Sequence, residues 1–429
     1  MSSTRAALAA LLAVFAVVVV ANAATYPPGR GYDAHWHEAY VEGLRERREL
    51  PREGEYYTPP GFYTVAAAAM WTAEQAGVGE PRRAVQLLNG LLALGTAVLL
   101  LLLARTLFPG REVLHVAAVG AFALGAWAAK AAAMFHPETL DLFLCTLALL
   151  LVTRMLAARR FSVPAALALG LVLGAAQLVR AFSLWTVAVA VFGLLAAALV
   201  GGAGRRRAPL VAAGAAVAAS LVLAGPWYVR QAVEFSDPIF APPAPQEPLW
   251  QRRPPAFYLD PGLPEVITAP HRPNFVNRFL PQLYADAWGD YFGFFGWDAQ
   301  ERRPSPAERR QLSAQSIVGL VPTGLALAGW IALLVAAARR RPELVPVALL
   351  PLAGIAGMLY FTVSYPTPDG DVIKAQYMLT TAPAWALAFG YAVDRLWRGR
   401  ALRLALAVAL VPAAVVSWAF SVYALGPGP

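Results

Sequence analysis

The feature that most constrains the fold of this chain of 429 residues is a series of long apolar runs. A run of about 18 or more apolar residues is long enough to cross a bilayer as a helix. Within lipid only helices and closed barrels satisfy their own backbone, and barrel strands would alternate apolar and polar residues, which these runs do not. Only 14% of the residues are charged, and the mean hydropathy is +0.52. The sequence therefore predicts an all-α polytopic membrane protein.

Hydropathy predicts about eleven membrane spans. The first ends in Ala21-Asn22-Ala23, which resembles a signal-peptidase site, so a cleaved signal segment is the alternative there. The only cysteine, Cys145, lies inside a predicted span, so a disulfide within the chain is impossible. The spans are expected near residues 5–24, 85–104, 113–133, 138–156, 163–180, 183–200, 208–226, 313–338, 343–363, 376–394 and 401–424.

Arginines in the short loops orient the spans. If residues 60–78 lie flat on the outer surface, every short loop rich in arginine faces the cytoplasm, as the positive-inside rule requires. If 60–78 crossed the membrane instead, the arginines at 159–160 and 205–207 would lie outside. We therefore expect the N-terminus inside, the C-terminus outside, and the polar segments 25–84 and 227–312 on the outer face. The net charge of +9 then reflects topology, and nucleic-acid binding is not expected.

Two outer segments carry titratable side chains that could perform chemistry. In "GYDAHWHEAY" (31–40), Asp33 and His37 would share one face of a helix, so the carboxylate could act as a general base beside an imidazole. A solvated loop with aromatic anchors is the alternative there. In "MFHPETLDLF", His136, Glu138 and Asp141 lie where lipid begins, and ionisable groups at that depth usually serve a site. The alternative is helix capping, because proline followed by glutamate suits the first turn of a helix.

Three cations are expected at the outer ends of spans: Arg180, Arg230 and Lys374. Snorkelling toward the interface explains each one alone, whereas together they would form an anion site suited to a phosphate. The aromatic segment 284–298, "YADAWGDYFGFFGWD", is either an interfacial belt or a platform for a sugar ring or lipid chain. The sequence has no P-loop, GxSxG, HExxH or CxxC motif, so nothing supports soluble nucleotide-dependent chemistry.

The order of these features resembles the GT-C glycosyltransferases of the ArnT/PMT/RgtA-D type. After the first span, "GYDAHWH" places an acidic residue after tyrosine, and "YYTPPGFYTVAA" is similar to the "PPL-Y" segment of that family. The outer turn "FHPETLDLF" resembles its "N-P-D-x-L" turn. "LALGLVLGAAQLVRAFSLW" is similar to its "GLxxGLAxLxR" span, and "GPWYVRQAVEFSDPIF" to its "PWxxRNxxxFGxP" exit. The resemblance covers residues 1–240; beyond them, only the topology and "KAQYMLTTAPAWAL", which looks like "RYLLPxxPAL", fit.

The resemblance implies a GT-C-type bundle with extracytoplasmic juxtamembrane helices. It also implies transfer of a sugar, with inversion, from a polyprenyl-phosphate-linked donor to an extracytoplasmic acceptor: a cell-envelope glycan, a lipid or a protein. Asp33 matches the acidic residue of the first loop, as catalytic base or metal-side ligand. Glu138 matches the catalytic acidic residue of the second loop, although "HPE" replaces "NPD". Residues expected to bind substrate are His35, His37, Tyr57, Arg82, His136, Asp141, Arg180, Arg230, Lys374 and Tyr377.

One departure from the family concerns the acidic pair that usually follows the first span, which is Asp33-Ala34 here. His35 or His37 could compensate, and together with His136 they could hold a divalent metal ion such as zinc. We expect three regions in a plasma-membrane protein whose active site faces outward. They are a catalytic membrane module (1–240, with the first outer loop 25–84), an extracytoplasmic loop (241–312) and C-terminal membrane helices (313–429).

The main alternative function is that of a transporter or a flippase for lipid-linked sugars. Such proteins more often contain a repeat with broken helices and polar residues near mid-membrane, and the sequence shows no convincing internal repeat. A non-catalytic membrane scaffold would explain the topology but not the gathering of acidic and basic residues on one face. The sequence therefore favours a membrane glycosyltransferase.

Overall fold

The computed structural model describes residues 3–239, 247–297 and 302–426. Within those ranges every regular element is helical, as the apolar runs predict. The short segments η1 (Gly43–Arg47) and η6 (Ala375–Thr381) are a π-helix and a 3-10 helix. The α-helices are α1 (Ser3–Thr25), α2 (Ala34–Glu42), α3 (Gly61–Gln75), α4 (Arg82–Leu107), α5 (Glu112–Leu124), α6 (Ala126–Ala133), α7 (Glu138–Ala158), α8 (Val163–Gln177), α9 (Leu184–Val200), α10 (Arg207–Phe235), α11 (Pro255–Leu259), α12 (Glu265–Thr268), α13 (Phe279–Trp288), α14 (Pro306–Ala338), α15 (Val345–Ser364), α16 (Ala382–Leu396) and α17 (Gly399–Ser421).

The chain is a multi-pass membrane protein. Among the described residues, eight helices are long and apolar enough to cross a membrane, and the bent pair α5–α6 makes up to nine. The other two predicted spans, 163–180 and 376–394, coincide with α8 and α16, which have 15 residues each. A helix of that length spans less than the roughly 30 Å of hydrocarbon. The count of about eleven therefore stays a prediction.

The span expected at 113–133 is broken rather than continuous. Between α5 and α6 the axis bends by 44°, and Gly125 has extended dihedral angles there. A Cβ on Gly125 would lie 2.7 Å from the carbonyl oxygen of Ala121, so only glycine fits this break. The bend directs Lys130 of α6 toward α13, where its ammonium group donates to the carbonyl oxygens of Asp286 and Gly289.

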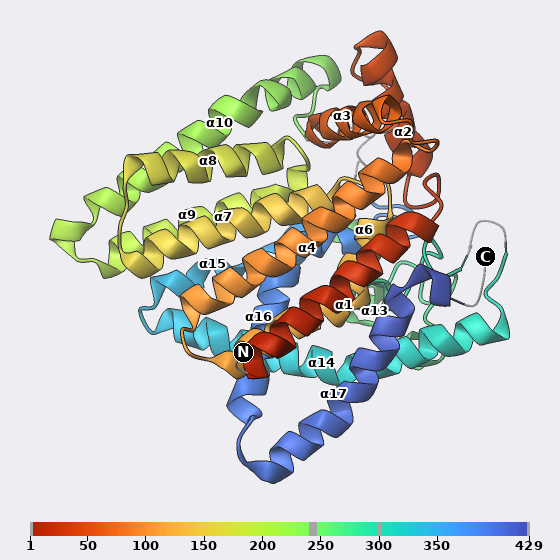
Figure 1. The fold of residues 1–429 in the computed structure, drawn as a ribbon. Coiled ribbons are helices and arrows are strands. Elements are labelled where there is room, and N and C mark those ends of the chain that lie inside the picture. The colour runs from red at the N-terminus through yellow and green to blue at the C-terminus, as the bar shows by residue number, and fades with distance from the viewer. Residues whose placement is uncertain (1–2, 240–246, 298–301, 427–429) are drawn as a thin grey trace.

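The helices pack in pairs, and small residues set their closest approaches. Helix α8 packs along α10, α14 along α16, and α4 along α7 (Figure 1). A Cβ on Gly170 of α8 would collide with the carbonyl oxygen of Ala216 in α10. Small residues that let helix backbones approach closely are typical of membrane bundles. Helix α1 packs against α4 and α5 as part of this bundle.

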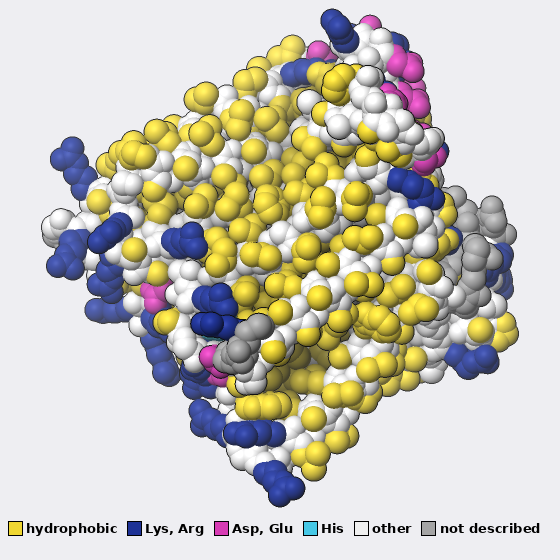
Figure 2. All heavy atoms as spheres, in the orientation of Figure 1, with side chains coloured by type: hydrophobic (Ala, Val, Ile, Leu, Met, Phe, Trp, Pro, Cys, Tyr) yellow, Lys and Arg dark blue, Asp and Glu magenta, His cyan; other side chains and the backbone are white. Residues whose placement is uncertain are grey.

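The two ends of the bundle differ in character. Figure 1 places α2 and α3 at the end opposite the N-terminus. Figure 2 shows a broad hydrophobic band over the helices, with Lys and Arg side chains gathered along the left and lower edge. Acidic side chains gather instead near α2 and α3. Helix α3 matches the expected surface helix at 60–78, and its orientation in a membrane stays a prediction.

The division into three regions also stays a prediction. The boundary at residue 240 lies outside the described residues. Helix α14 already begins at Pro306, inside the expected loop 241–312, because Ser305 and Glu308 form a capping box there.

Candidate active site

Asp33 begins α2 in a left-handed backbone conformation (φ 52°), which aspartate tolerates better than most residues. Gly31, two residues earlier, has φ +131° and lies against the side chain of Met134. Between them, the buried Tyr32 ring anchors the turn. The Asp33 side chain is 36% exposed, so its carboxylate can meet a ligand from outside.

The Asp33 carboxylate pairs with the ammonium group of Lys374, 3.1 Å away at the other end of the sequence. Lys374 is buried and also lies 3.7 Å from the Asp371 carboxylate. Its ammonium faces the rings of Tyr32 and Tyr377. Partial burial works to raise the pKa of Asp33, but the Lys374 cation, followed by His37 and Arg180, outweighs it, so this pKa lies below its ordinary value. Asp33 is therefore ionised at neutral pH.

A second ion pair lies on the other side of Asp33. The Arg180 guanidinium donates to one oxygen of Glu138, Oε1, through both Nε (2.7 Å) and Nη2 (2.5 Å). Its Nη1 donates to the hydroxyl of Thr58 (3.0 Å) and lies 3.6 Å from Glu55. Arg180 and Glu138 are both buried. Through these contacts Arg180 holds Glu138 and the loop at 55–58 in place.

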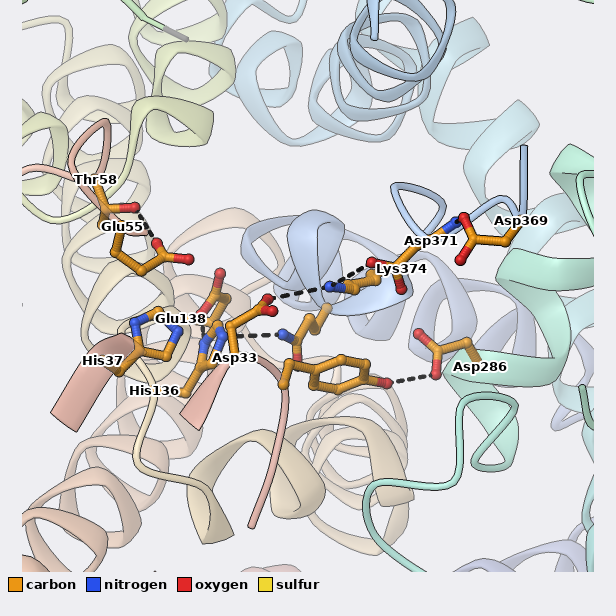
Figure 3. A network of polar contacts seen from close by, with 12 residues as sticks. Asp33, His37, Glu55, Thr58, His136, Glu138, Asp286, Asp369, Asp371 and Lys374 are labelled. Carbon is orange, nitrogen blue, oxygen red and sulfur yellow. Dashed lines mark hydrogen bonds and ion pairs between the residues drawn. The ribbon is translucent and has the colours of Figure 1, made fainter. Parts of the chain in front are cut away.

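Two buried histidines fill the space beside these pairs (Figure 3). Their rings meet edge to face at 4.4 Å. His37 shares a hydrogen bond with the Tyr63 hydroxyl (2.8 Å), and the Nδ1 of His136 contacts Glu138. Burial lowers the pKa of His37 to about 4 and that of His136 well below its ordinary value. Both imidazoles are therefore neutral at neutral pH.

One buried carboxylate ties the two halves of the site together from behind. Asp286 of α13 accepts a hydrogen bond from the Tyr32 hydroxyl (2.8 Å) and another from the backbone N–H of Ala375 (2.7 Å). These two donors adjoin Asp33 and Lys374 in the sequence. The Lys130 ammonium lies 4.0 Å from the same carboxylate. Asp286 therefore fixes the distance between the first outer loop and η6.

The structure brings most of the predicted residues together. Tyr57 donates to Glu55 (3.1 Å), and the Arg180 and Lys374 cations lie 5.5 and 5.7 Å from the centre of the Tyr377 ring. Sequence reasoning missed Glu55, Thr58, Asp286, Asp371 and Gln376. The only signal for Asp371 was its place three residues before Lys374 in an outer turn. Polar loop residues such as Glu55 follow no periodicity that hydropathy detects.

Four predicted residues lie elsewhere. The exposed His35 ring packs beside Trp36, and Arg82 pairs with Glu38 and Glu80. Asp141 is buried one turn further into α7 and accepts from the Cys145 thiol. Arg230 pairs with Glu234 and lines a separate cavity of about 770 Å³ with Tyr40 and the 47–53 loop. Arg230 lies near the end of α10 and faces that loop, and the convergence of Arg180, Arg230 and Lys374 on one cavity stays a prediction.

The charges of the cluster decide what it can bind. Four carboxylates (Asp33, Glu55, Glu138 and Asp371) face two cations, and the histidines are neutral. The cluster is therefore not a simple anion site. A phosphate that enters it must compete with Asp33 and Asp371 for the Lys374 ammonium.

The described residues do not fit a metal ion as they stand. Across 3–239, 247–297 and 302–426, there is no group of three or more His, Cys, Asp or Glu side chains placed to hold one. His37 contacts the Tyr63 hydroxyl through Nδ1. His136 contacts Glu138 through Nδ1 and Gln376 through Nε2.

The comparisons of sequence found no match, whereas the comparison of folds found several solved structures. No protein-family model and no curated protein matches the sequence. Among solved structures, the apo oligosaccharyltransferase from Archaeoglobus fulgidus matches with a TM-score of 0.61 and 14% identity, over 99% of this chain and 57% of that one. The same AglB protein with an inhibitory peptide and a dolichol-phosphate matches with a TM-score of 0.56 and 14% identity, over 98% and 56%.

ArnT from Cupriavidus metallidurans bound to undecaprenyl phosphate matches with a TM-score of 0.52 and 16% identity, over 98% of this chain and 76% of that one. The chain thus spans little more than half the length of the archaeal oligosaccharyltransferase. At these identities the likeness concerns the backbone arrangement. By that arrangement the chain has the GT-C fold of membrane glycosyltransferases.

Proposed function

We propose that this protein transfers a sugar from a polyprenyl-phosphate-linked donor to a hydroxyl of an extracytoplasmic acceptor, with inversion at the sugar carbon. One observation carries the proposal: a partly exposed carboxylate, Asp33, is paired with a buried cation, Lys374, inside a GT-C fold. Two solved structures with this fold hold dolichol-phosphate or undecaprenyl phosphate. The acceptor would be a cell-envelope glycan, a lipid or a protein, and the membrane would be the plasma membrane.

In the proposed step the acceptor oxygen attacks the anomeric carbon while Asp33 takes its proton. The bond from that carbon to the phosphate oxygen breaks, and the phosphate leaves with the electron pair. Lys374 is the cation placed to stabilise the departing phosphate. Arg180 keeps its ion pair with Glu138 and serves as a positioning residue.

The ion pair between Asp33 and Lys374 couples donor binding to base strength. Lys374 lowers the pKa of Asp33 in the free protein. A donor phosphate that takes a share of the Lys374 ammonium weakens its attraction for Asp33, so the pKa of Asp33 rises. The carboxylate thereby becomes a stronger base once the donor is in place.

The test is transfer from polyprenyl-phosphate hexose and pentose donors to acceptors in a membrane extract, with purified full-length protein in lipid nanodiscs. Asp33→Asn keeps the shape but removes the base, so transfer should fall by about 10²-fold or more. Glu74→Gln, in an exposed ion pair with Arg45, is the matched control and should keep full activity. Near-full activity of Asp33→Asn would remove Asp33 from the mechanism. Loss of the sugar from envelope glycans when the protein is absent, seen by mass spectrometry, would identify the product.

A transporter or flippase would give a different result. It would move the lipid-linked sugar between leaflets without forming a glycosidic bond. Neither the wild type nor Asp33→Asn would then add a sugar to the acceptor. The same nanodiscs, assayed for a new glycosidic product, separate the two functions.

A further inference from the structure

A second cavity, of about 650 Å³, lies at the arginine-rich end of the bundle, between the C-terminal ends of α14 and α16. The two helices touch at Gly329, where a Cβ would collide with the backbone carbonyl of Ala388. One to two turns further on, the cavity opens between them. Volumes of this size hold drug-sized ligands.

One wall of the cavity is apolar. Ala332, Val335 and Ala336 of α14 form it, and Val335 is 47% exposed. These residues belong to a helix that is apolar enough to cross a membrane. The wall is therefore continuous with the surface that meets lipid chains, and an occupant with an apolar part can enter from the side.

The other wall is cationic. Arg339, Arg341, Arg395 and Arg398 line it, and none of the cavity's lining residues is acidic. Arg341 pairs with Glu343, which lies outside the lining, and Arg395 donates to the hydroxyl of the buried Tyr391. After the pair with Glu343 is allowed for, the cavity keeps an excess of three positive charges.

Helix dipoles account for only part of this charge. Each helix C-terminus is equivalent to about half a negative charge, so the ends of α14 and α16 together offset about one arginine. The positive-inside rule explains why arginines lie at this end, but not why four of them surround one hollow with an apolar wall. The remaining charge would attract an anion to the cavity.

We propose that this cavity binds the anionic headgroup of a phospholipid, with its phosphate among Arg339, Arg395 and Arg398 and its acyl chains along the apolar wall of α14. Basic pockets between membrane helices at this depth suit such headgroups. In the predicted topology the lipid belongs to the cytoplasmic leaflet. The site is at the opposite end of the bundle from Asp33, so the proposal is independent of the transferase activity.

The experiment is native mass spectrometry of the full-length protein with added dioleoyl phosphatidylglycerol or dioleoyl phosphatidylcholine. Wild-type protein should retain one phosphatidylglycerol and no phosphatidylcholine. Each cation near an anionic headgroup contributes about fivefold in affinity, so the triple variant Arg339→Gln, Arg395→Gln, Arg398→Gln should bind about 100-fold more weakly. The matched control neutralises 205–207, an exposed basic cluster at the same end that does not line the cavity, and should bind like the wild type.

A second variant keeps the charges and blocks the space. Val335→Trp fills the apolar wall while all four arginines stay, so the bound phosphatidylglycerol should be lost even if the triple variant folds poorly. Equal weakening in the triple variant and the 205–207 control would show general attraction to basic surface and overturn the site. So would displacement of the lipid by millimolar inorganic phosphate, since the occupant would then be free phosphate rather than a lipid.

Discussion

At the residue scale, the proposed chemistry depends on a carboxylate whose ion-pair partner comes from the far end of the chain. Asp33 and Lys374 are 341 residues apart and meet at 3.1 Å. Asp33 supplies a partly exposed acidic group, and Lys374 supplies a buried cation. Because the two charges neutralise each other in the free protein, the proposed base is ionised, and its charge is balanced by Lys374 until a second anion binds.

The pH dependence of transfer should change when Lys374 is removed. Asp33 must be ionised to act as a base, so the rate falls as the pH drops through its pKa, which Lys374 holds below the ordinary value. In Lys374→Gln that pKa rises, and the acid limb of kcat/KM should move to higher pH. The rate itself should fall by about 10²-fold, because the departing phosphate loses its cation.

Profiles of kcat/KM against pH for wild type and variant check this prediction. An acid limb at the same pH in both proteins would mean that Lys374 does not control Asp33. A full rate with a shifted limb would mean that Lys374 controls the pKa of Asp33 but does not stabilise the departing phosphate.

His37 should make the folded protein sensitive to acid. Its folded pKa is about 4, below the ordinary 6.5, because burial disfavours the charged ring. The unfolded chain then binds more protons between these values, so stability is full above about pH 6.5 and falls toward pH 4 by about 3 kcal/mol. His37→Gln, whose amide can still bond Tyr63, should lose less of its unfolding temperature over this range. His35→Gln, exposed on the same helix, should behave like the wild type; if all three proteins respond alike, the acid sensitivity comes from other groups.

The site was only partly predictable at this scale. Asp33, His37, His136 and Glu138 stood out because titratable residues are rare beside apolar runs. Glu55 and Asp286 did not, since their segments are polar or aromatic throughout and their partners lie far away in the sequence. The surroundings of Arg230 could not be predicted, because a motif gives the position of a residue along the helix but not the side it faces.

At the element scale, hydropathy located the helices well because each one must satisfy its own backbone in lipid. It did not show the break at Gly125, whose neighbours are as apolar as the rest of the span. The break has a function in the architecture, since it sends Lys130 to the α13 backbone and so supports Asp286. Tertiary contacts of this kind leave no trace in a local window of sequence.

The close packing of α8 against α10 should require that Gly170 has no side chain. A Cβ on Gly170 would collide with the backbone of α10, and Gly174 is almost as close, at 3.0 Å from its neighbours. Gly170→Ala should therefore lower stability by about 1–3 kcal/mol through overpacking. Gly214→Ala in α10 meets open space and should be neutral or stabilising, because alanine favours helices. Thermal unfolding in detergent compares the two variants. A Gly170→Ala protein as stable as Gly214→Ala would show that α8 and α10 can move apart without loss of stability.

At the scale of the whole molecule, the backbone arrangement is retained where the sequence is not. Nearly the whole chain superimposes on structures that are only 14–16% identical. The physical reason is that any apolar residue satisfies a span, whereas the order of spans and outer loops decides which side chains meet. The Asp33 and Lys374 pair depends on that order, since one residue follows α1 and the other precedes η6.

The orientation of that arrangement in the membrane is testable with single cysteines. Arginine-rich loops at one end predict that this end is cytoplasmic. Ala307, exposed in the first turn of α14 at the other end, is a suitable outer reporter. The neighbouring Ser305 is not used, because it caps the helix. Ala307→Cys in whole cells should react with an impermeant maleimide, whereas Arg206→Cys should react only after the membrane is opened. The unmodified chain is the control, since Cys145 is fully buried. Labelling of Arg206→Cys in intact cells with protection of Ala307→Cys would place Asp33 in the cytoplasm and rule out transfer to an outer acceptor.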